Sequence, residues 1–275
     1  MKFFATVLFT AAPALGLIAD ISSPLNDYNL SYDRSERTMV MARSQADFRE
    51  AKIHVAERRG RRWSAPSPIS FSDERYSDSD PWLTPDGQTL FFISDRPAPG
   101  REEGRTDYDI WRSERLADGW SAPVHLGMTI NGRGQELGPE LHGGTLYFSS
   151  ARRNGLGGLD IYQSRLIGDD FEPAELLPGP INSPSSESDF TLSGDGTAAM
   201  FWRSAGERGL IHIVYRDGRG WSQPQELPAS INLGPFNFTP SFNRDGTRIR
   251  FASTVERPGQ ASGLADIYDM LLPAR

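Results

Sequence analysis

Acidic side chains stand just before several apolar runs of the sequence, at a recurring position. Asp80, Glu136 and Asp189 are the three that could form a catalytic set. Two carboxyl groups in a cleft can hydrolyse a glycosidic bond, because one protonates the leaving oxygen while the other acts as base or nucleophile. These residues support a carbohydrate-active enzyme as one interpretation of the sequence.

Arginines occupy a second recurring position, after the next apolar run. If acids and arginines share one face, they form a polar funnel able to hold a peptide, a glycan or an ion. The same residues could instead form structural salt bridges and turn caps, because recurrence in every repeat is what an architecture demands. Arg101 stands apart, in the long and least repetitive loop 95–108. The predicted binding residues are Arg43, Asp78, Asp80, Arg96, Arg101, Glu136, Arg152, Glu187, Asp189, Arg203 and Arg257.

Other catalytic and metal-binding patterns are missing from the sequence. The chain has no cysteine, which excludes disulfides and thiolate nucleophiles. Its four histidines lie in different contexts without metal-ligand spacing, and no serine lies in a Gly-x-Ser-x-Gly motif. We therefore expect no metal site and no cofactor.

The composition limits the class of partner. The formal net charge is −7, with 29 basic residues scattered among 36 acidic ones. Nucleic-acid binding needs a concentrated basic surface, so DNA and RNA are not expected partners. No apolar run is long enough to span a membrane.

A repeat of about 50 residues positions these side chains. Its clearest marker is a tight Asp-Gly turn followed by an apolar run, which predicts two antiparallel strands. Third strands are predicted around 109–111, 160–162 and 266–268, and fourth strands begin with Trp-Ser-x-Pro stretches, where proline suits an outer edge. The turns lie at 83–87, 192–196 and 242–246, with weaker copies at 30–33 and 141–144.

Five such units predict an all-β fold, a single five-bladed β-propeller of four-stranded antiparallel blades. The last repeat has only three predicted strands, so the segment 17–21 is expected to supply the fourth and close the ring. The propeller is expected to span 17–275. Its repeats cover about 25–71, 72–130, 131–181, 182–231 and 232–275.

The N-terminus has two interpretations. One Lys, an apolar run over 3–9 and small residues up to Gly16 resemble a secretory signal, removed as residues 1–16. This predicts a periplasmic or secreted protein. Alternatively, Pro13, Leu17 and Ile21 match the spacing of Pro173, Leu177 and Ile181, which would make the segment an ordinary strand in a cytoplasmic protein.

The stretch from Pro81 to Trp111, with Pro-x-Leu-Thr-Pro-Asp-Gly, Leu-Phe-Phe-x-Ser and Asp-Ile-Trp, resembles the repeats of the TolB-like (WD40-like) β-propeller family. The resemblance covers nearly the whole chain. It implies a propeller, often exported, that binds a protein or an envelope component. TolB itself has six blades and an extra α/β domain, so its role in the Tol-Pal system is not carried over.

The repeat architecture accounts for the acids, arginines and turn residues that recur in the sequence. The sequence therefore predicts a non-catalytic binding or scaffolding module. We expect it to be a monomer that recognises a protein or envelope component through its loop face. The alternative is a glycosidase-like enzyme with Asp80, Glu136 and Asp189 in the central cleft.

Overall fold

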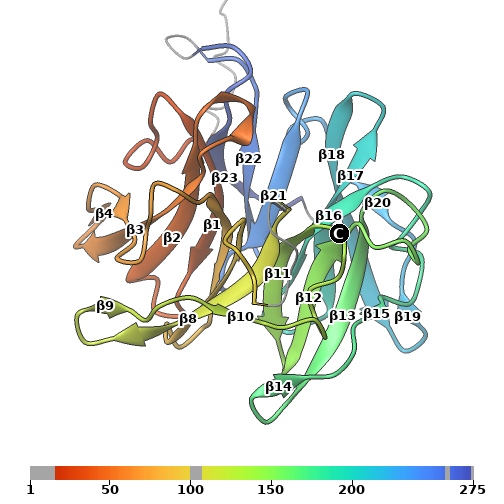
Figure 1. The fold of residues 1–275 in the computed structure, drawn as a ribbon. Coiled ribbons are helices and arrows are strands. Elements are labelled where there is room, and N and C mark those ends of the chain that lie inside the picture. The colour runs from red at the N-terminus through yellow and green to blue at the C-terminus, as the bar shows by residue number, and fades with distance from the viewer. Residues whose placement is uncertain (1–15, 100–106, 258–260, 274–275) are drawn as a thin grey trace, which may run out of the picture.

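The computed structural model describes residues 16–99, 107–257 and 261–273. It is an all-β propeller of five antiparallel blades arranged around a central axis (Figure 1). The described residues contain one short 3-10 helix, Ala46–Phe48, and no helix long and apolar enough to cross a bilayer. The predicted fold class is confirmed.

Each blade begins with an inner strand next to the central axis, followed by two further strands that pair in sequence order. The inner strands are β1 (Asn26–Tyr32), β6 (Asp78–Leu83), β11 (Glu136–His142), β16 (Glu187–Leu192) and β21 (Asn237–Phe242). The second strands are β2 (Thr38–Ser44), β7 (Thr89–Ser94), β12 (Thr145–Ser150), β17 (Ala198–Ala205) and β22 (Arg248–Ser253). The third strands are β3 (Lys52–Arg59), β8 (Asp109–Leu116), β13 (Asp160–Ile167), β18 (Arg208–Asp217) and β23 (Asp266–Leu271).

Tight turns join the first two strands of each blade. In three blades the turn contains Gly87, Gly196 or Gly246, with φ near +70°. Glycine adopts this conformation without a steric penalty, which is why the Asp-Gly pairs mark these hairpins in the sequence.

The fourth strand is short and split into two pieces, with a proline between them. Proline lacks an N–H, so it interrupts the ladder of hydrogen bonds where the edge faces solvent. The paired pieces are β4 (Arg62–Trp63) and β5 (Ser67–Pro68), β9 (Gly119–Trp120) and β10 (Val124–His125), β14 (Asp170–Phe171) and β15 (Glu175–Leu176), and β19 (Gly220–Trp221) and β20 (Gln225–Glu226).

The N-terminal segment closes the ring as predicted. Blade 5 has only β21, β22 and β23, and Leu17 forms an antiparallel bridge with Tyr268 at its outer edge. The Ile18 N–H donates to the Ile267 carbonyl at 3.1 Å, and Ile21 is 1% exposed. Residues 1–15, which carry most of the predicted signal, lie outside the described residues.

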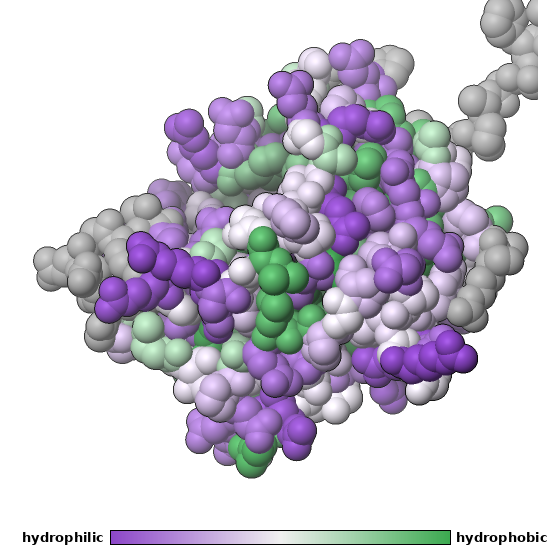
Figure 2. Space-filling model, turned by 90° about the vertical axis from the view of Figure 1, so that its right-hand side faces the viewer, coloured by the Kyte–Doolittle hydropathy of each residue, from purple (hydrophilic) through white to green (hydrophobic). Residues whose placement is uncertain are grey.

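The hydrophobic core lies between neighbouring blades. For example, Val40 and Ile53 of blade 1 pack with Leu90 and Phe92 of blade 2 in one buried cluster. Figure 2 shows a largely hydrophilic outer face on which apolar residues form only small groups. Each blade therefore buries its faces against its neighbours, and the ring positions the five inner strands around a common channel.

Candidate functional site

One residue of each inner strand lies in a β-bulge with a positive φ angle. The register of every inner strand shifts at this point. A bulge re-aims the side chains around it, and here five bulges face one axis. The five residues, which we call the waist ring, are Asn29, Asp80, Gly138, Asp189 and Thr239, with φ between +46° and +56°.

Hydrogen bonds link the waist ring from blade to blade. The N–H of Gly138 donates to Asp80 Oδ2 at 3.0 Å, and the N–H of Thr239 donates to Asp189 Oδ2 at 3.0 Å. The N–H of Asn29 donates to Thr239 Oγ1 at 3.2 Å and thereby joins blade 1 to blade 5. The side chains at the waist are therefore held in place by backbone groups of the next blade.

Asp80 and Asp189 are the two carboxyl groups of the waist ring, and they are close enough to influence each other. Burial, followed by the charge of Asp80, raises the pKa of Asp189 to about 7. Burial also raises the pKa of Asp80, while the Gly138 N–H and the Ser79 hydroxyl oppose that rise. The charge of Asp80 disfavours ionisation of Asp189, so we assign the proton to Asp189 and the negative charge to Asp80 near neutral pH.

Gly138 separates the two carboxyl groups. Its N–H contacts Asp80, and a Cβ added at this position would lie 3.4 Å from Asp189 Oδ1. No side chain therefore stands between the two acids on this side of the channel. The pair is the kind of arrangement in which one carboxyl group can give a proton while the other carries charge.

The waist ring contributes to two cavities at opposite ends of the inner strands. The hairpin-side cavity, about 690 Å³, lies toward the turns that join first and second strands. The loop-side cavity, about 310 Å³, lies toward the loops that enter the inner strands. Asp80, Asp189 and Thr239 line both. The hairpin-side cavity is within the usual size range of small-molecule sites.

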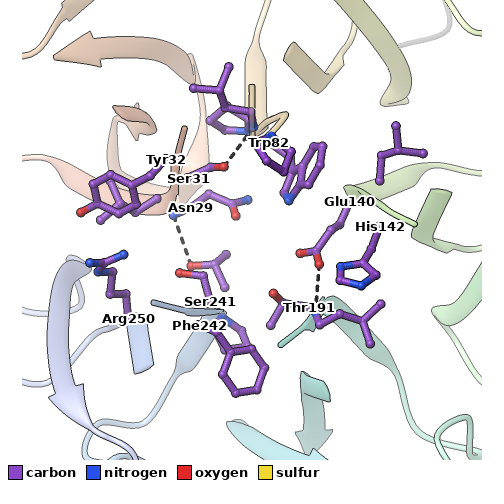
Figure 3. A pocket seen from close by; sticks show the side chains of 18 of the residues that line it. Asn29, Ser31, Tyr32, Trp82, Glu140, His142, Thr191, Ser241, Phe242 and Arg250 are labelled. Atoms are coloured by element: carbon purple, nitrogen blue, oxygen red, sulfur yellow. Dashed lines mark hydrogen bonds between the residues drawn. The ribbon is translucent and has the colours of Figure 1, made fainter. Parts of the chain in front are cut away.

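A third acid, Glu140, lines the hairpin-side cavity. It is 8% exposed and accepts a hydrogen bond from the Leu192 N–H at 2.9 Å. Burial raises the pKa of Glu140 to about 7. In Figure 3 its side chain points toward the interior of the pocket, with Trp82 and His142 nearby and Tyr32 and Arg250 across the opening. The cavity thus presents acids together with aromatic and polar side chains.

Most predicted binding residues lie elsewhere, in ion pairs at the starts of the inner strands. In four blades an arginine bonds a carboxylate whose side chain is at most 1% exposed. The same arginine donates to a carbonyl of the incoming linker, such as Ile181 O at 2.7 Å from Arg203. These four pairs are Arg43–Asp27 at 2.7 Å, Arg96–Asp78 at 2.7 Å, Arg152–Glu136 at 3.2 Å and Arg203–Glu187 at 2.8 Å.

The sequence prediction placed Glu136 in the central cleft, and the structure corrects this. Glu136 begins β11, is fully buried, and contacts Arg152 and the Ser150 hydroxyl instead of lining either cavity. Its position is two residues before the bulge, so its side chain belongs to the blade interior. Arg257 pairs with Asp266 in blade 5, and Arg101 lies outside the described residues.

Glu140 was not predicted as a site residue, although the sequence carries a signal for it. Proline follows the waist residue in Asp80-Pro81, Gly138-Pro139 and Thr239-Pro240. Proline inside a strand is confined to edges and bulges, so these pairs mark the waist. Glu140 follows one such pair directly and therefore enters the cavity.

Comparisons with known proteins give the fold. No protein-family model and no curated protein sequence matches the chain. Among solved structures, TolB from Acinetobacter baumannii is similar with a TM-score of 0.51 and 15% identity, over 93% of this chain but only 56% of TolB. The chain thus spans just over half of TolB, and TolB-like membership stays a sequence-based interpretation.

Two glycoside hydrolases match over nearly their whole length. An α-L-arabinofuranosidase from Lactobacillus brevis has a TM-score of 0.59 and 13% identity, covering 94% of this chain and 95% of that one. An endo-arabinase from Bacteroides thetaiotaomicron has a TM-score of 0.57 and 13% identity, covering 96% and 99%. These matches overturn the prediction of a non-catalytic scaffold and favour the carbohydrate-active alternative.

Proposed function

We propose that the chain is a glycoside hydrolase whose active site is the hairpin-side cavity, with Asp80 and Asp189 as its catalytic residues. The observation that carries this proposal is the electrostatic pairing of two carboxyl groups at the waist, without an arginine or lysine bonded to either among the described residues. Such a pair keeps one proton available near neutral pH, which is what acid catalysis of glycoside cleavage requires.

Each carboxyl group has a defined role. Asp189, protonated, donates its proton to the glycosidic oxygen as the bond to the anomeric carbon breaks. Asp80, ionised, either takes a proton from the attacking water or attacks the anomeric carbon itself, and the anomer released first distinguishes these two routes. Glu140, also protonated near neutral pH, donates a hydrogen bond to a sugar hydroxyl.

The cavity suits a sugar. Trp82 and Phe242 offer apolar ring surface in this cavity, and His142 offers a polar contact. Across the opening, the Arg250 guanidinium lies 4.2 Å over the Tyr32 ring. Aromatic rings pack well against the C–H faces of sugars while leaving their hydroxyl groups for polar partners. α-L-Arabinofuranosides and arabinan, on which the matched enzymes act by name, are therefore the first substrates to test.

The test is hydrolysis of p-nitrophenyl α-L-arabinofuranoside and of arabinan by the full chain. Asp80→Asn and Asp189→Asn should each lower kcat/KM at least about 100-fold, the usual contribution of acid–base catalysis. Asp195→Asn, in the exposed hairpin after β16, is the matched control and should retain activity. Equal activity in all three variants, or no release of arabinose from either substrate, contradicts the proposal.

We also propose that the enzyme works outside the cytoplasm, as the signal-like residues 1–16 suggest. Mass spectrometry of the protein from its native host should find an N-terminus at Leu17. An intact N-terminus in the active protein would contradict this location.

A further inference from the structure

The loop-side cavity has walls of aromatic rings. Five rings form an unbroken chain of contacts from blade 1 through blade 5 to blade 4. Phe48 lies 5.3 Å from Tyr28 and 5.4 Å from Phe238, measured between ring centroids. Phe238 lies 5.0 Å from Phe236, which lies 5.5 Å from Trp202. All five line the cavity.

These rings are inclined to one another and are not stacked. The plane of Phe48 is inclined by 86° to that of Tyr28 and by 88° to that of Phe238. Rings set at right angles present faces in more than one direction, and each face carries the negative part of the ring quadrupole. Tyr28 and Phe238 are also almost fully buried, at 4% and 6% exposed, which fixes their orientation.

The inner end of the loop-side cavity is acidic. Asp80 and Asp189 line it, and no lysine, arginine or histidine is among its described lining residues. The other polar groups of the lining are neutral, namely those of Ser79, Gln135, Ser188 and Thr239, the hydroxyls of Tyr28 and Tyr108 and the indole N–H of Trp202. Both the walls and the inner end therefore favour positive charge.

We propose that the loop-side cavity binds a compact organic cation, an alkylated ammonium group such as trimethylammonium. Ring faces attract such a cation, and its methyl groups pack against apolar walls, while Asp80 supplies the counter-charge. Hard metal ions are held by several oxygen ligands, and the described residues contain no group of three or more His, Asp or Glu side chains placed to hold one. A volume of about 310 Å³ matches a small head group better than a large ligand.

This inference does not rest on the proposed hydrolase activity, because cation binding is measured without any sugar substrate. The two proposals share Asp80 and Asp189, which line both cavities. Two compounds test the proposal directly. Choline carries a trimethylammonium group, and 3,3-dimethyl-1-butanol is its neutral isostere with the same shape. The difference between the affinities for these two compounds gives the contribution of the charge alone.

Titration calorimetry of the full chain should show one choline site, with the neutral isostere bound at least about tenfold more weakly. Equal affinity for the two would show an apolar pocket without cation recognition and would overturn the proposal. Absence of binding for choline and for tetramethylammonium would overturn it as well.

Two phenylalanines of β21 provide a matched pair of variants. Phe238 lines the loop-side cavity and Phe242 lines the hairpin-side cavity. Phe238→Leu should weaken choline binding about tenfold, and Phe242→Leu should leave it unchanged. Phe48→Leu, a change at a half-buried position of the otherwise exposed 3-10 helix, gives the same readout if Phe238→Leu fails to fold. Equal effects of Phe242→Leu and of Phe238→Leu, or of Phe48→Leu in its place, would put the cation elsewhere and overturn the assignment.

Discussion

Two carboxylates stand two residues apart on β16, and their surroundings differ completely. Glu187 is fully buried and bonded by Arg203, whose guanidinium also reaches the linker carbonyl of Ile181. Asp189 faces the channel and bonds only neutral donors, the N–H of Thr239 and the hydroxyl of Ser188. The same contrast separates Asp78, bonded by Arg96, from Asp80 on β6.

This difference separates acids that hold the blades together from acids that are free to do chemistry. The acid–arginine pair recurs in four blades because each blade must fasten the linker that enters it. The waist ring changes residue type from blade to blade, with two acids, an amide, a hydroxyl and a glycine. In a repeat protein, residues that vary at one structural position are better candidates for function than residues that recur.

The largest effect is expected from breaking a paired carboxylate. Arg203→Met leaves Glu187 charged and buried, and should lower the free energy of unfolding by about 3 kcal/mol. This is the lower end of the usual range, because the arginine side chain is 20% exposed. Urea denaturation of the full chain at pH 8 measures it.

Two further variants are the controls for Arg203→Met. Adding Glu187→Gln to Arg203→Met removes the stranded charge and should restore most of the lost stability. Asp189→Asn alone should leave stability at pH 8 equal or higher, because no cation depends on Asp189. A loss for Asp189→Asn as large as that for Arg203→Met would erase the distinction between the two sites.

The next effect is a slope of the unfolding free energy against pH, not the loss caused by one substitution. The pKa values of Asp189 and Glu140 are raised to about 7, above unfolded values near 4, so the folded chain binds their protons more tightly. These two protonated groups stabilise the folded chain fully at low pH. That contribution to the free energy of unfolding is lost as pH rises from about 4 through 7, by up to about 1.4 kcal/mol per pH unit for each group.

The combined variant Asp189→Asn and Glu140→Gln should therefore flatten this part of the stability profile. Urea denaturation at several values between pH 5 and pH 8 compares the slopes. An unchanged slope would mean that both groups titrate normally. Glu136, whose pKa burial also raises to about 7, remains in both proteins and cancels from the comparison.

The smallest expected effect tests the role of Gly138, which lies between Asp80 and Asp189. Gly138→Ala places a side chain at φ +56° and should cost about 1 kcal/mol of unfolding free energy. Gly143→Ala, also at φ +56° but with nothing within 4 Å of the new Cβ, should cost the same. Only the change at position 138 touches Asp189, so only it should shift the pH dependence of activity. Identical pH profiles would place the carboxyl pair away from Gly138.

Much of the fold follows from local sequence signals. Asp-Gly turns, alternating apolar runs and proline at outer edges act over a few residues, so they predict strands and hairpins directly. Their regular spacing predicts the five blades, and the incomplete last repeat predicts closure by Leu17. The third acid, Glu140, was missed because the bulge that turns it into the cavity depends on the register between two strands.

The sequence by itself determined that this chain forms five equivalent blades with acids and arginines at recurring positions. It did not determine which acids have arginine partners, because Asp78 and Asp80, or Glu187 and Asp189, are equally acidic neighbours in the sequence. Only the tertiary structure decided this. A bulge reverses the direction of one residue in each inner strand, and ring closure brings Asp80 and Asp189, more than 100 residues apart, to opposite sides of one glycine.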